Sequence, residues 1–277
     1  MVAVAFTDSI RPSESDLACS ANDPSEKLVA IHQYIYAWGS IGRRQVDEII
    51  NVDTYIHVFA DNKTYEGGWL NDTIIQRQME VLNDGFAQSN IHFILKGTER
   101  NITSPPNFGG PPDPLTAFYG KIRKGDYRSL NLYYMPRMYG GECSFPGMPG
   151  AIDQFSTEFI LDGCRMGSDT TPGGKEPFSS GKTTIHEVGH WFGLLHTFKG
   201  GCNATHGDYI DDTPAEAEYV RENMGDCPKG RNSCPHLLGL DPIDNYMGYT
   251  SDDCRRKFTG GQISRMRKIW KLVRIVW

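Results

Sequence analysis

The stretch Thr183-Thr-Ile-His-Glu-Val-Gly-His-Trp-Phe-Gly-Leu-Leu-His196 determines how the rest of this chain is interpreted. It contains the pattern H-E-x-x-H-x-x-G-x-x-H, with His186 and His190 four residues apart and His196 six residues further on. Positions i and i+4 of an α-helix lie on one face, so both imidazoles can reach one ion while Glu187 lies beside them. The stretch therefore predicts a metal-binding helix.

Gly193 indicates where this helix ends. Glycine is poorly suited to a helix interior, but it suits a helix end that leaves through a left-handed turn. Such a turn would bring His196 back to the other two histidines as a third ligand. Three neutral imidazoles on zinc leave a fourth position for water, which is the arrangement of catalytic zinc sites. The alternative is an ordinary helix with three hydrogen-bonded histidines.

Length and charge restrict the classes of function. The chain has 277 residues and a formal net charge of −6, which argues against a general nucleic-acid binder. It contains no run of eighteen apolar residues, so we expect no membrane-spanning helix. We also expect a monomer.

Cysteines and glycosylation sequons favour a secreted protein. Four cysteines lie in a segment rich in Gly, Pro, Asn and Asp after the histidine pattern: Cys202, Cys227, Cys234 and Cys254. Loop-rich sequence of this kind gains stability from disulfides, which persist mainly outside the cytosol. Sequons begin at Asn62, Asn71, Asn101 and Asn203. Residues 1–6 are too short for the core of a signal peptide, so a secretory leader is not visible in this sequence.

The order of predicted elements indicates an α+β fold. Helical spacing or strand-like composition predicts helices over 24–38, 71–86, 115–124 and 259–275, and strands over 49–60, 91–95 and 130–135. Loops are expected at 105–114 and 140–150, an extended segment at 155–166, and irregular structure over 197–257. We therefore expect a mixed, twisted sheet backed by helices, followed by an irregular, disulfide-bonded C-terminal subdomain.

The composition along the chain also indicates the domain organisation. Residues 1–24 are polar and lack a period, so we expect a loose lead-in. Because no linker or repeat interrupts the remainder, residues 25–277 are expected to form a single catalytic domain. Its upper part would run to residue 196 and its lower part from 197 to 277, with the cleft between them.

A second motif, Asn245-Tyr-Met-Gly-Tyr249, follows the histidine pattern. A methionine turn after the long histidine motif is the signature of the metzincin metalloproteases. Further stretches resemble the pappalysin-type metzincins, in particular secreted fungal and bacterial members. They are Gly181–Phe198, Gly207-Asp208 with Asp212-Thr-Pro214, Asp241-Pro242, and Asp253-Cys254 with Phe258-Thr-Gly-Gly-Gln262. The resemblance extends from about residue 25 to residue 270 and is densest after residue 180.

The resemblance implies a zinc endopeptidase that acts on protein or peptide substrates, and the chemistry of the residues agrees with it. Glu187 would accept a proton from the attacking water and pass it to the leaving amine. Met247 would form an apolar floor beneath the metal site without binding the ion. Tyr249 matches the family tyrosine that faces the metal and stabilises the oxyanion, and its alternative is a tyrosine of the core or the rim.

The resemblance also implies features of the C-terminal part. The segment with Asp208, Asp211 and Thr213 resembles a calcium loop, for which the alternative is an acidic, solvated turn. The last four cysteines allow three pairings, of which the resemblance implies Cys202–Cys234 and Cys227–Cys254. Cys143 and Cys164 form a third candidate pair. Cys19 is left over, and we expect it to be unpaired or externally paired.

Substrate specificity is expected to depend on the segment after the methionine turn. The resemblance places Asp253 at the base of the S1′ pocket. A partly desolvated carboxylate pairs well with the planar guanidinium of arginine. The expectation is cleavage on the amino side of Arg, then Lys. The alternative is that Asp252 and Asp253 form a solvated acidic turn.

A different class of function would be a catalytically weak, protease-like binding or inhibitory module. Such a protein would be expected to lack a zinc histidine or the glutamate, and this chain retains all of them. A non-proteolytic zinc hydrolase would not explain the methionine turn. The other histidines, at 32, 57, 92, 206 and 236, have no ligand spacing and are expected to be structural or exposed.

Overall fold

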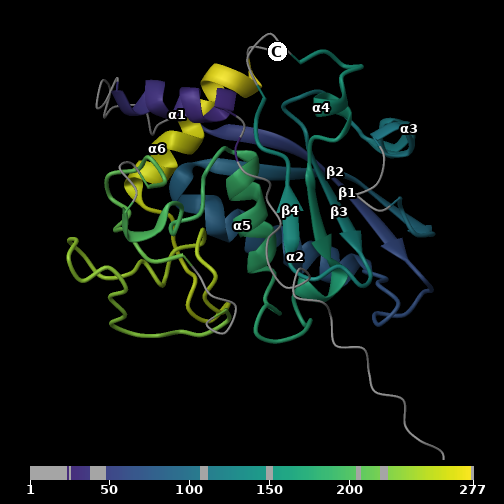
Figure 1. Ribbon diagram of the computed structural model, residues 1–277. Coiled ribbons are helices and arrows are strands. Elements are labelled where there is room, and N and C mark those ends of the chain that lie inside the picture. Colours follow the sequence, from purple (N-terminus) through teal and green to yellow (C-terminus); the bar gives the residue numbers. More distant parts are fainter. Residues whose placement is uncertain are drawn as a thin grey trace, which may run out of the picture.

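The computed structural model describes residues 24, 26–37, 48–106, 112–147, 152–203, 207–218 and 224–275. The predicted lead-in up to residue 23, Cys19 and His206 lie outside these residues. The helices are α1 (Glu26–Ala37), α2 (Asp72–Phe86), α3 (Pro112–Ile122), α4 (Thr157–Ile160), α5 (Lys182–Trp191) and α6 (Gly260–Ile269). The strands are β1 (Ile50–Ala60), β2 (Ile91–Ile102), β3 (Leu130–Met135), β4 (Gly141–Cys143) and β5 (Cys164–Gly167). The α+β fold predicted from the sequence is confirmed (Figure 1).

The strands form one mixed sheet in the order β2-β1-β3-β5-β4. The first four are parallel to their neighbours, and the edge strand β4 runs antiparallel to β5. This arrangement places β4 at one edge of the sheet, next to α5 (Figure 1).

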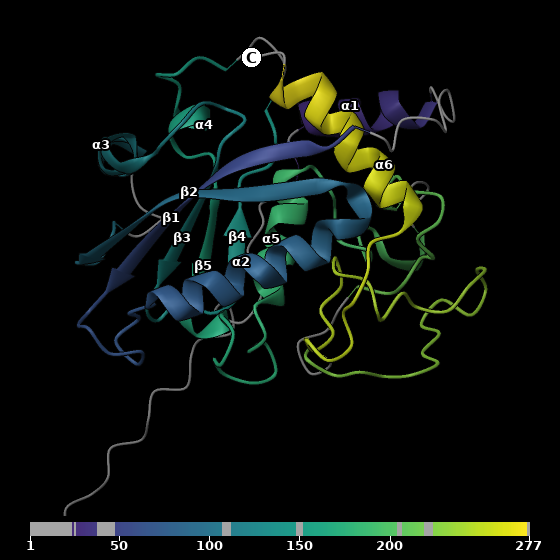
Figure 2. The ribbon, with the colours of Figure 1, turned by 180° about the vertical axis from the view of Figure 1, so that it is seen from behind.

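Helices cover both faces of the sheet. On β3, Leu132 and Tyr134 point to the face covered by α2 and α5, where they share a core cluster with Ile185 and Val188. Tyr133 points to the opposite face and packs with Tyr119 of α3. Successive side chains of a strand alternate between faces, so β3 is buried on both sides. Figure 2 shows α2 lying across the back of the molecule.

Caps determine where two helices begin. The Asn71 side chain accepts a hydrogen bond from the Ile74 amide (3.0 Å), as its position before α2 predicts. The Thr259 hydroxyl accepts from the Gln262 amide (3.1 Å), while the Gln262 side chain accepts from the Thr259 amide (2.9 Å). This reciprocal capping box starts α6. The predicted helix 259–275 is confirmed, with a π-helical turn over Trp270–Arg274 as its last part.

Two segments differ from the sequence prediction. Residues 140–150 were expected to be a loop, but they contain β4, whose three residues pair with β5. Residues 155–166 were expected to be extended, but Ser156 caps the short helix α4 within them. Helix α3 begins at Pro112 rather than Leu115, because proline is well suited to the first helical position.

The C-terminal part is irregular, as predicted. In the described residues between 197 and 257, regular structure is limited to a 3₁₀ turn at Gly201–Asn203 and a bridge between Asn245 and Lys257. Disulfides join Cys202 to Cys234 and Cys227 to Cys254, which are the pairings implied by the sequence resemblance. A third disulfide joins Cys143 to Cys164 across β4 and β5. No described helix is both long and apolar enough to cross a lipid bilayer.

Candidate active site

Helix α5 carries His186, Glu187 and His190, and a sharp turn follows it. Gly193 has φ 82°, the left-handed conformation for which glycine is suited. Its amide donates to the His190 carbonyl (2.7 Å), and the next amide, of Leu194, donates to the Gly189 carbonyl (2.9 Å). These bonds satisfy the last carbonyls of the helix and reverse the chain. The reversal brings the imidazole of His196 back to α5.

The three imidazoles point at one another through their Nε2 atoms. The Nε2–Nε2 distances are 3.2 Å for His186–His190, 3.2 Å for His186–His196 and 3.0 Å for His190–His196. The Nδ1 atoms of His186 and His190 lie 2.7 Å from the carbonyls of Tyr246 and Leu194. A carbonyl only accepts, so each Nδ1 carries the proton and each Nε2 presents a lone pair to the centre of the group.

This geometry fits a divalent cation. Two bare lone pairs do not form a hydrogen bond, and a cation between them removes their repulsion. A tetrahedral ion with Zn–N bonds of 2.0–2.1 Å needs nitrogens about 3.3–3.4 Å apart, close to the separations found here. In the part of the chain that the structure describes, this is the one cluster of at least three His, Cys, Asp or Glu side chains spaced to hold an ion.

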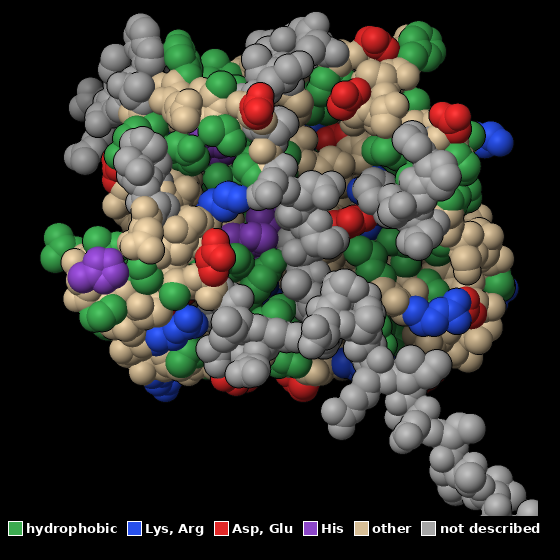
Figure 3. Space-filling view, in the orientation of Figure 1, with side chains coloured by type: hydrophobic (Ala, Val, Ile, Leu, Met, Phe, Trp, Pro, Cys, Tyr) green, Lys and Arg blue, Asp and Glu red, His purple; other side chains and the backbone are tan. Residues whose placement is uncertain are grey.

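Electrostatics keeps the histidines in the neutral, ligand-competent form. Burial lowers the pKa of His190 to about 4 and lowers the pKa values of His186 and His196 well below the usual range. His186 and His190 are buried, and His196 is partly exposed. The partial exposure of His196 leaves one side of the group open to solvent. Figure 3 shows histidine side chains in the middle of the face drawn.

Glu187 lies next to His186 and is fully buried between α5 and β4. A Cβ atom at Gly141 of β4 would lie 2.6 Å from its Cγ atom. The structure thus places the predicted base on α5 at the residue after His186, with its side chain packed against β4.

Met247 lies directly beneath the helix. It is fully buried, and a Cβ atom at Gly189 would lie 2.4 Å from its Sδ atom. Its amide donates to the Asn245 side chain (2.9 Å), whose amide group donates in turn to Gln262 of α6 (2.8 Å). Sequence reasoning identified Met247 but missed Gly189 and Gln262, because their partners are distant in the chain.

Tyr249 lies beside the same group. Its ring centroid is 4.9 Å from that of His196 and 5.7 Å from that of His186. It also packs on Phe198, with centroids 4.8 Å apart. The tyrosine is partly exposed, as is His196.

Asp253 differs from its predicted environment. The prediction required a partly desolvated carboxylate, but the Asp253 side chain is exposed. The buried carboxylate is the preceding one, Asp252, which forms an ion pair with Arg255 and accepts from the amide and hydroxyl of Ser180 (2.8 Å each). These bonds join the segment after the methionine turn to the residues that lead into α5.

The residues of the predicted calcium loop lie close together. The Thr213 hydroxyl contacts both carboxylate oxygens of Asp208 at 2.7 and 2.8 Å, and Asp211 lines the same surface pocket. Burial raises the pKa of Asp208 to about 7. Asp212 instead contacts α6, where its oxygens accept from the Thr259 hydroxyl (2.6 Å) and the Gly261 amide (2.8 Å).

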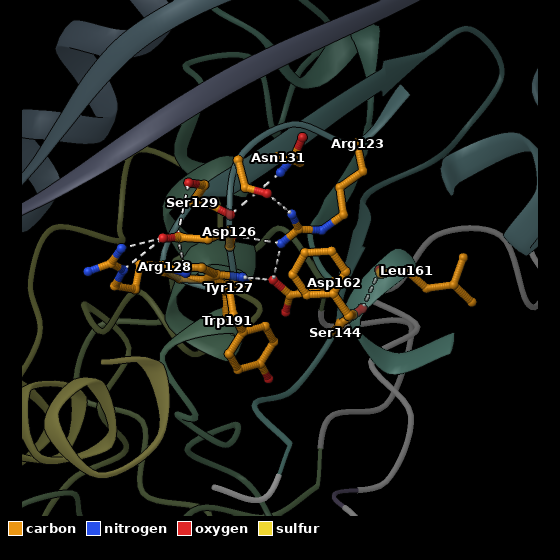
Figure 4. Close-up of polar contacts among 12 residues, drawn as sticks. Arg123, Asp126, Tyr127, Arg128, Ser129, Asn131, Ser144, Leu161, Asp162 and Trp191 are labelled. Atoms are coloured by element: carbon orange, nitrogen blue, oxygen red, sulfur yellow. Dashed lines mark hydrogen bonds and ion pairs between the residues drawn. The ribbon is translucent and has the colours of Figure 1, made fainter. Parts of the chain in front are cut away.

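A buried ionic cluster holds the end of α5. The Trp191 indole donates to Asp162 (3.0 Å), and Arg274 donates to the Trp191 carbonyl (2.9 Å) and to both oxygens of Asp162 (2.9 Å each). Arg123 approaches Asp162 on another side, at 3.6 Å (Figure 4). No local motif marks these residues, so the sequence analysis did not find them.

The sequence comparisons agree with this site. A profile of the pregnancy-associated plasma protein-A family matches residues 144–271. The chain is 41% identical over 265 residues to an extracellular metalloprotease of Pyricularia oryzae, covering 93% of this chain and 89% of that protein. It is 40% identical over 269 residues to an extracellular metalloprotease of Podospora anserina, covering 91% and 88% of the two chains.

Solved structures show the same fold. Mature mirolysin of Tannerella forsythia in complex with a cleaved peptide has a TM-score of 0.63 at 24% identity, over 83% of this chain and 95% of that one. A promirolysin mutant has a TM-score of 0.66 at 24% identity, over 90% and 89%. Together with the histidine geometry and the sequence relatives, this shows that the chain is a metalloendopeptidase of the pregnancy-associated plasma protein-A (pappalysin) family of metzincins.

Proposed function

We propose that this chain is a secreted zinc endopeptidase whose ion is held by His186, His190 and His196. The observation that carries this proposal is the convergence of three Nε2 atoms within 3.0–3.2 Å of one another. Two of the imidazoles are oriented by backbone carbonyls, which fixes the tautomer that binds a metal. Neutral imidazoles favour zinc among the common divalent ions of secreted hydrolases.

Zinc, when bound, polarises the scissile carbonyl and makes water a stronger nucleophile near neutral pH. Glu187 takes the proton of the attacking water and passes it to the leaving amine. The Tyr249 hydroxyl donates a hydrogen bond to the developing oxyanion. Met247 excludes water from the side of the zinc site that faces the methionine turn, because its buried thioether packs against the backbone of α5 at Gly189.

Metal analysis combined with a cleavage assay tests the proposal. We expect one zinc per chain, gelatin cleavage that a chelator abolishes, and recovery of cleavage after zinc is returned. His190→Ala is the matched control and should neither retain zinc nor cleave. Full cleavage by metal-depleted protein would contradict the proposal.

Secretion is supported by the extracellular relatives and by the three disulfides. The sequon asparagines at 62, 71, 101 and 203 are all exposed, as glycosylation requires. The proposed organisation is a monomeric catalytic domain with its cleft between residues 25–196 and 197–277. Intact mass before and after glycosidase treatment of protein from a secreting host would check the glycosylation, and sedimentation would check the monomer.

The proposed preference for Arg, then Lys, at P1′ rests on the sequence resemblance at Asp253. Because Asp253 is exposed, its carboxylate would lose water only when a substrate side chain covers it. The neighbouring Asp252 is buried, but its carboxylate is already paired with Arg255. A peptide library cleaved by the wild type and by Asp253→Ala tests it. Loss of an Arg preference in the variant would support the assignment, and wild-type cleavage before Leu or Phe would reject it.

Calcium binding is proposed for the loop with Asp208, Asp211 and Thr213. The buried carboxylate of Asp208 ionises above about pH 7. A cation beside it would stabilise this ionised form. We expect calcium, but not magnesium, to raise the melting temperature of the wild type at pH 8. The increase should be lost in Asp211→Asn, and an equal increase in both proteins would reject this site.

A further inference from the structure

The edge strand β4 contacts the proposed catalytic glutamate directly. Gly141 and Cys143 point to the α5 side of the sheet, and Cys143 belongs to the same core cluster as Ile185 and Val188 of that helix. At Gly141, a Cβ atom would lie 2.6 Å from Cγ, 2.7 Å from Oε1 and 2.8 Å from Cδ of Glu187. These separations are well below van der Waals contact, so the glutamate occupies the space that a side chain at 141 would need.

Three bonds hold this short strand in place. The Cys143–Cys164 disulfide joins residues that lie opposite each other in β4 and β5. The Ser144 amide donates to the Gly163 carbonyl (3.1 Å) at one end of β4, and the Gly167 amide donates to the Gly140 carbonyl (3.0 Å) at the other end. A three-residue strand has little pairing of its own, so the crosslink two residues from Gly141 limits how far its backbone can move.

We propose that Gly141 is a positioning residue for Glu187, and that the Cys143–Cys164 disulfide keeps it there. The inference rests on the proposed function, in which Glu187 transfers the proton. A glutamate has several rotatable bonds, and the close approach of the Gly141 backbone limits the rotamers that its carboxylate can adopt. Displacement of a catalytic group by about 1 Å can cost about 10²-fold in rate.

The test is a double-mutant cycle between the strand and the glutamate. The variants are Gly141→Ala, Glu187→Asp and the two together, with kcat, KM and zinc content measured for each. Gly141→Ala should retain zinc and lower kcat by roughly 10- to 100-fold with little change in KM. Because Asp is one methylene shorter, it fits beneath the added methyl group. Glu187→Asp should therefore cost roughly tenfold less in the Gly141→Ala background than in the wild type.

Gly120→Ala is the matched control, because a Cβ atom there meets Ile160 only at 3.7 Å. It should leave kcat unchanged and show no coupling with Glu187→Asp. Wild-type kcat in Gly141→Ala, or losses that simply multiply, would overturn the proposal. Glu187→Ala in the same series separates the two claims: an active Glu187→Ala defeats the proposed function, whereas an inactive one beside an unaffected Gly141→Ala defeats only the positioning role.

A second pair of variants covers the case in which Gly141→Ala does not fold. Removing the β4 crosslink with Cys143→Ser and Cys164→Ser should lower kcat at temperatures where the protein stays folded. Removing the Cys202–Cys234 crosslink, which does not touch β4, should spare kcat. Equal kcat in these two proteins would overturn the role of the Cys143–Cys164 disulfide.

Discussion

Gly189 lies in the chain between His186 and His190, two of the proposed zinc ligands, and its missing side chain leaves room for Met247. Alanine is the better helix former by up to about 1 kcal/mol. However, its methyl group would lie 2.4 Å from the Met247 sulfur, and overpacking of this kind costs about 1–3 kcal/mol. We therefore expect Gly189→Ala to be less stable in urea and to release zinc to a chelator faster. Gly120→Ala should gain stability, and the same gain in Gly189→Ala would contradict this packing.

The buried side chain of His32 is expected to make the stability of the protein depend on pH. Burial, reinforced by the neighbouring Arg265 guanidinium, lowers its pKa from 6.5 to about 3. The folded state therefore binds fewer protons than the unfolded state between these pH values. The free energy of unfolding should fall as the pH drops below 6.5, by about 3 kcal/mol at pH 4 from this residue.

Urea unfolding of His32→Gln at pH 4 to 7 measures that contribution. The variant should show a flatter dependence on pH than the wild type, whatever its stability at pH 7. His92→Gln, at an exposed histidine, should keep the wild-type slope. A wild-type slope in His32→Gln would show that His32 does not carry the effect.

Elements whose signals are local could be predicted from the sequence. Helix α2 has its cap at Asn71 and a regular apolar face, and α5 has the histidine spacing and Gly193. Strand β4 and helix α4 have three and four residues, too few for a period to appear. They are stabilised by contacts with β5 and the sheet. The same distinction applies to the residues of the site. The histidines and Met247 could be predicted because they lie in local motifs. Gly141 could not, because its contact with Glu187 joins residues that are distant in the chain.

The start of α6 gives a prediction at the scale of an element. Asp212, about 47 residues before the cap residue Thr259, accepts bonds from the Thr259 hydroxyl and the Gly261 amide. A carboxylate at a helix N-terminus satisfies an amide that has no helical partner and interacts favourably with the helix dipole. We expect Asp212→Ala to cost about 1 kcal/mol of stability. Exposed Asp253→Ala is the control, and equal stability of both variants would rule out the cap.

The stability of the whole molecule depends on the disulfides of its irregular C-terminal part. Its two disulfides span 32 and 27 residues, in a region with few regular hydrogen bonds. Each such bridge typically contributes about 2–4 kcal/mol. Reduction should therefore lower the melting temperature sharply, and alkylation should then trap the thiols. Peptide mapping that finds Cys202, Cys227, Cys234 and Cys254 as thiols before reduction would reject the prediction.

In the whole molecule α5 contacts the methionine turn at Gly189 and β4 at Glu187, and Glu187→Ala tests the central claim most directly. The variant should fold and bind one zinc per chain, because the three histidines, and the carbonyls that orient two of them, are unchanged. Its turnover should fall by roughly two to four orders of magnitude, the usual scale of acid–base catalysis. Turnover within a few-fold of the wild type in a zinc-loaded Glu187→Ala protein would contradict the account.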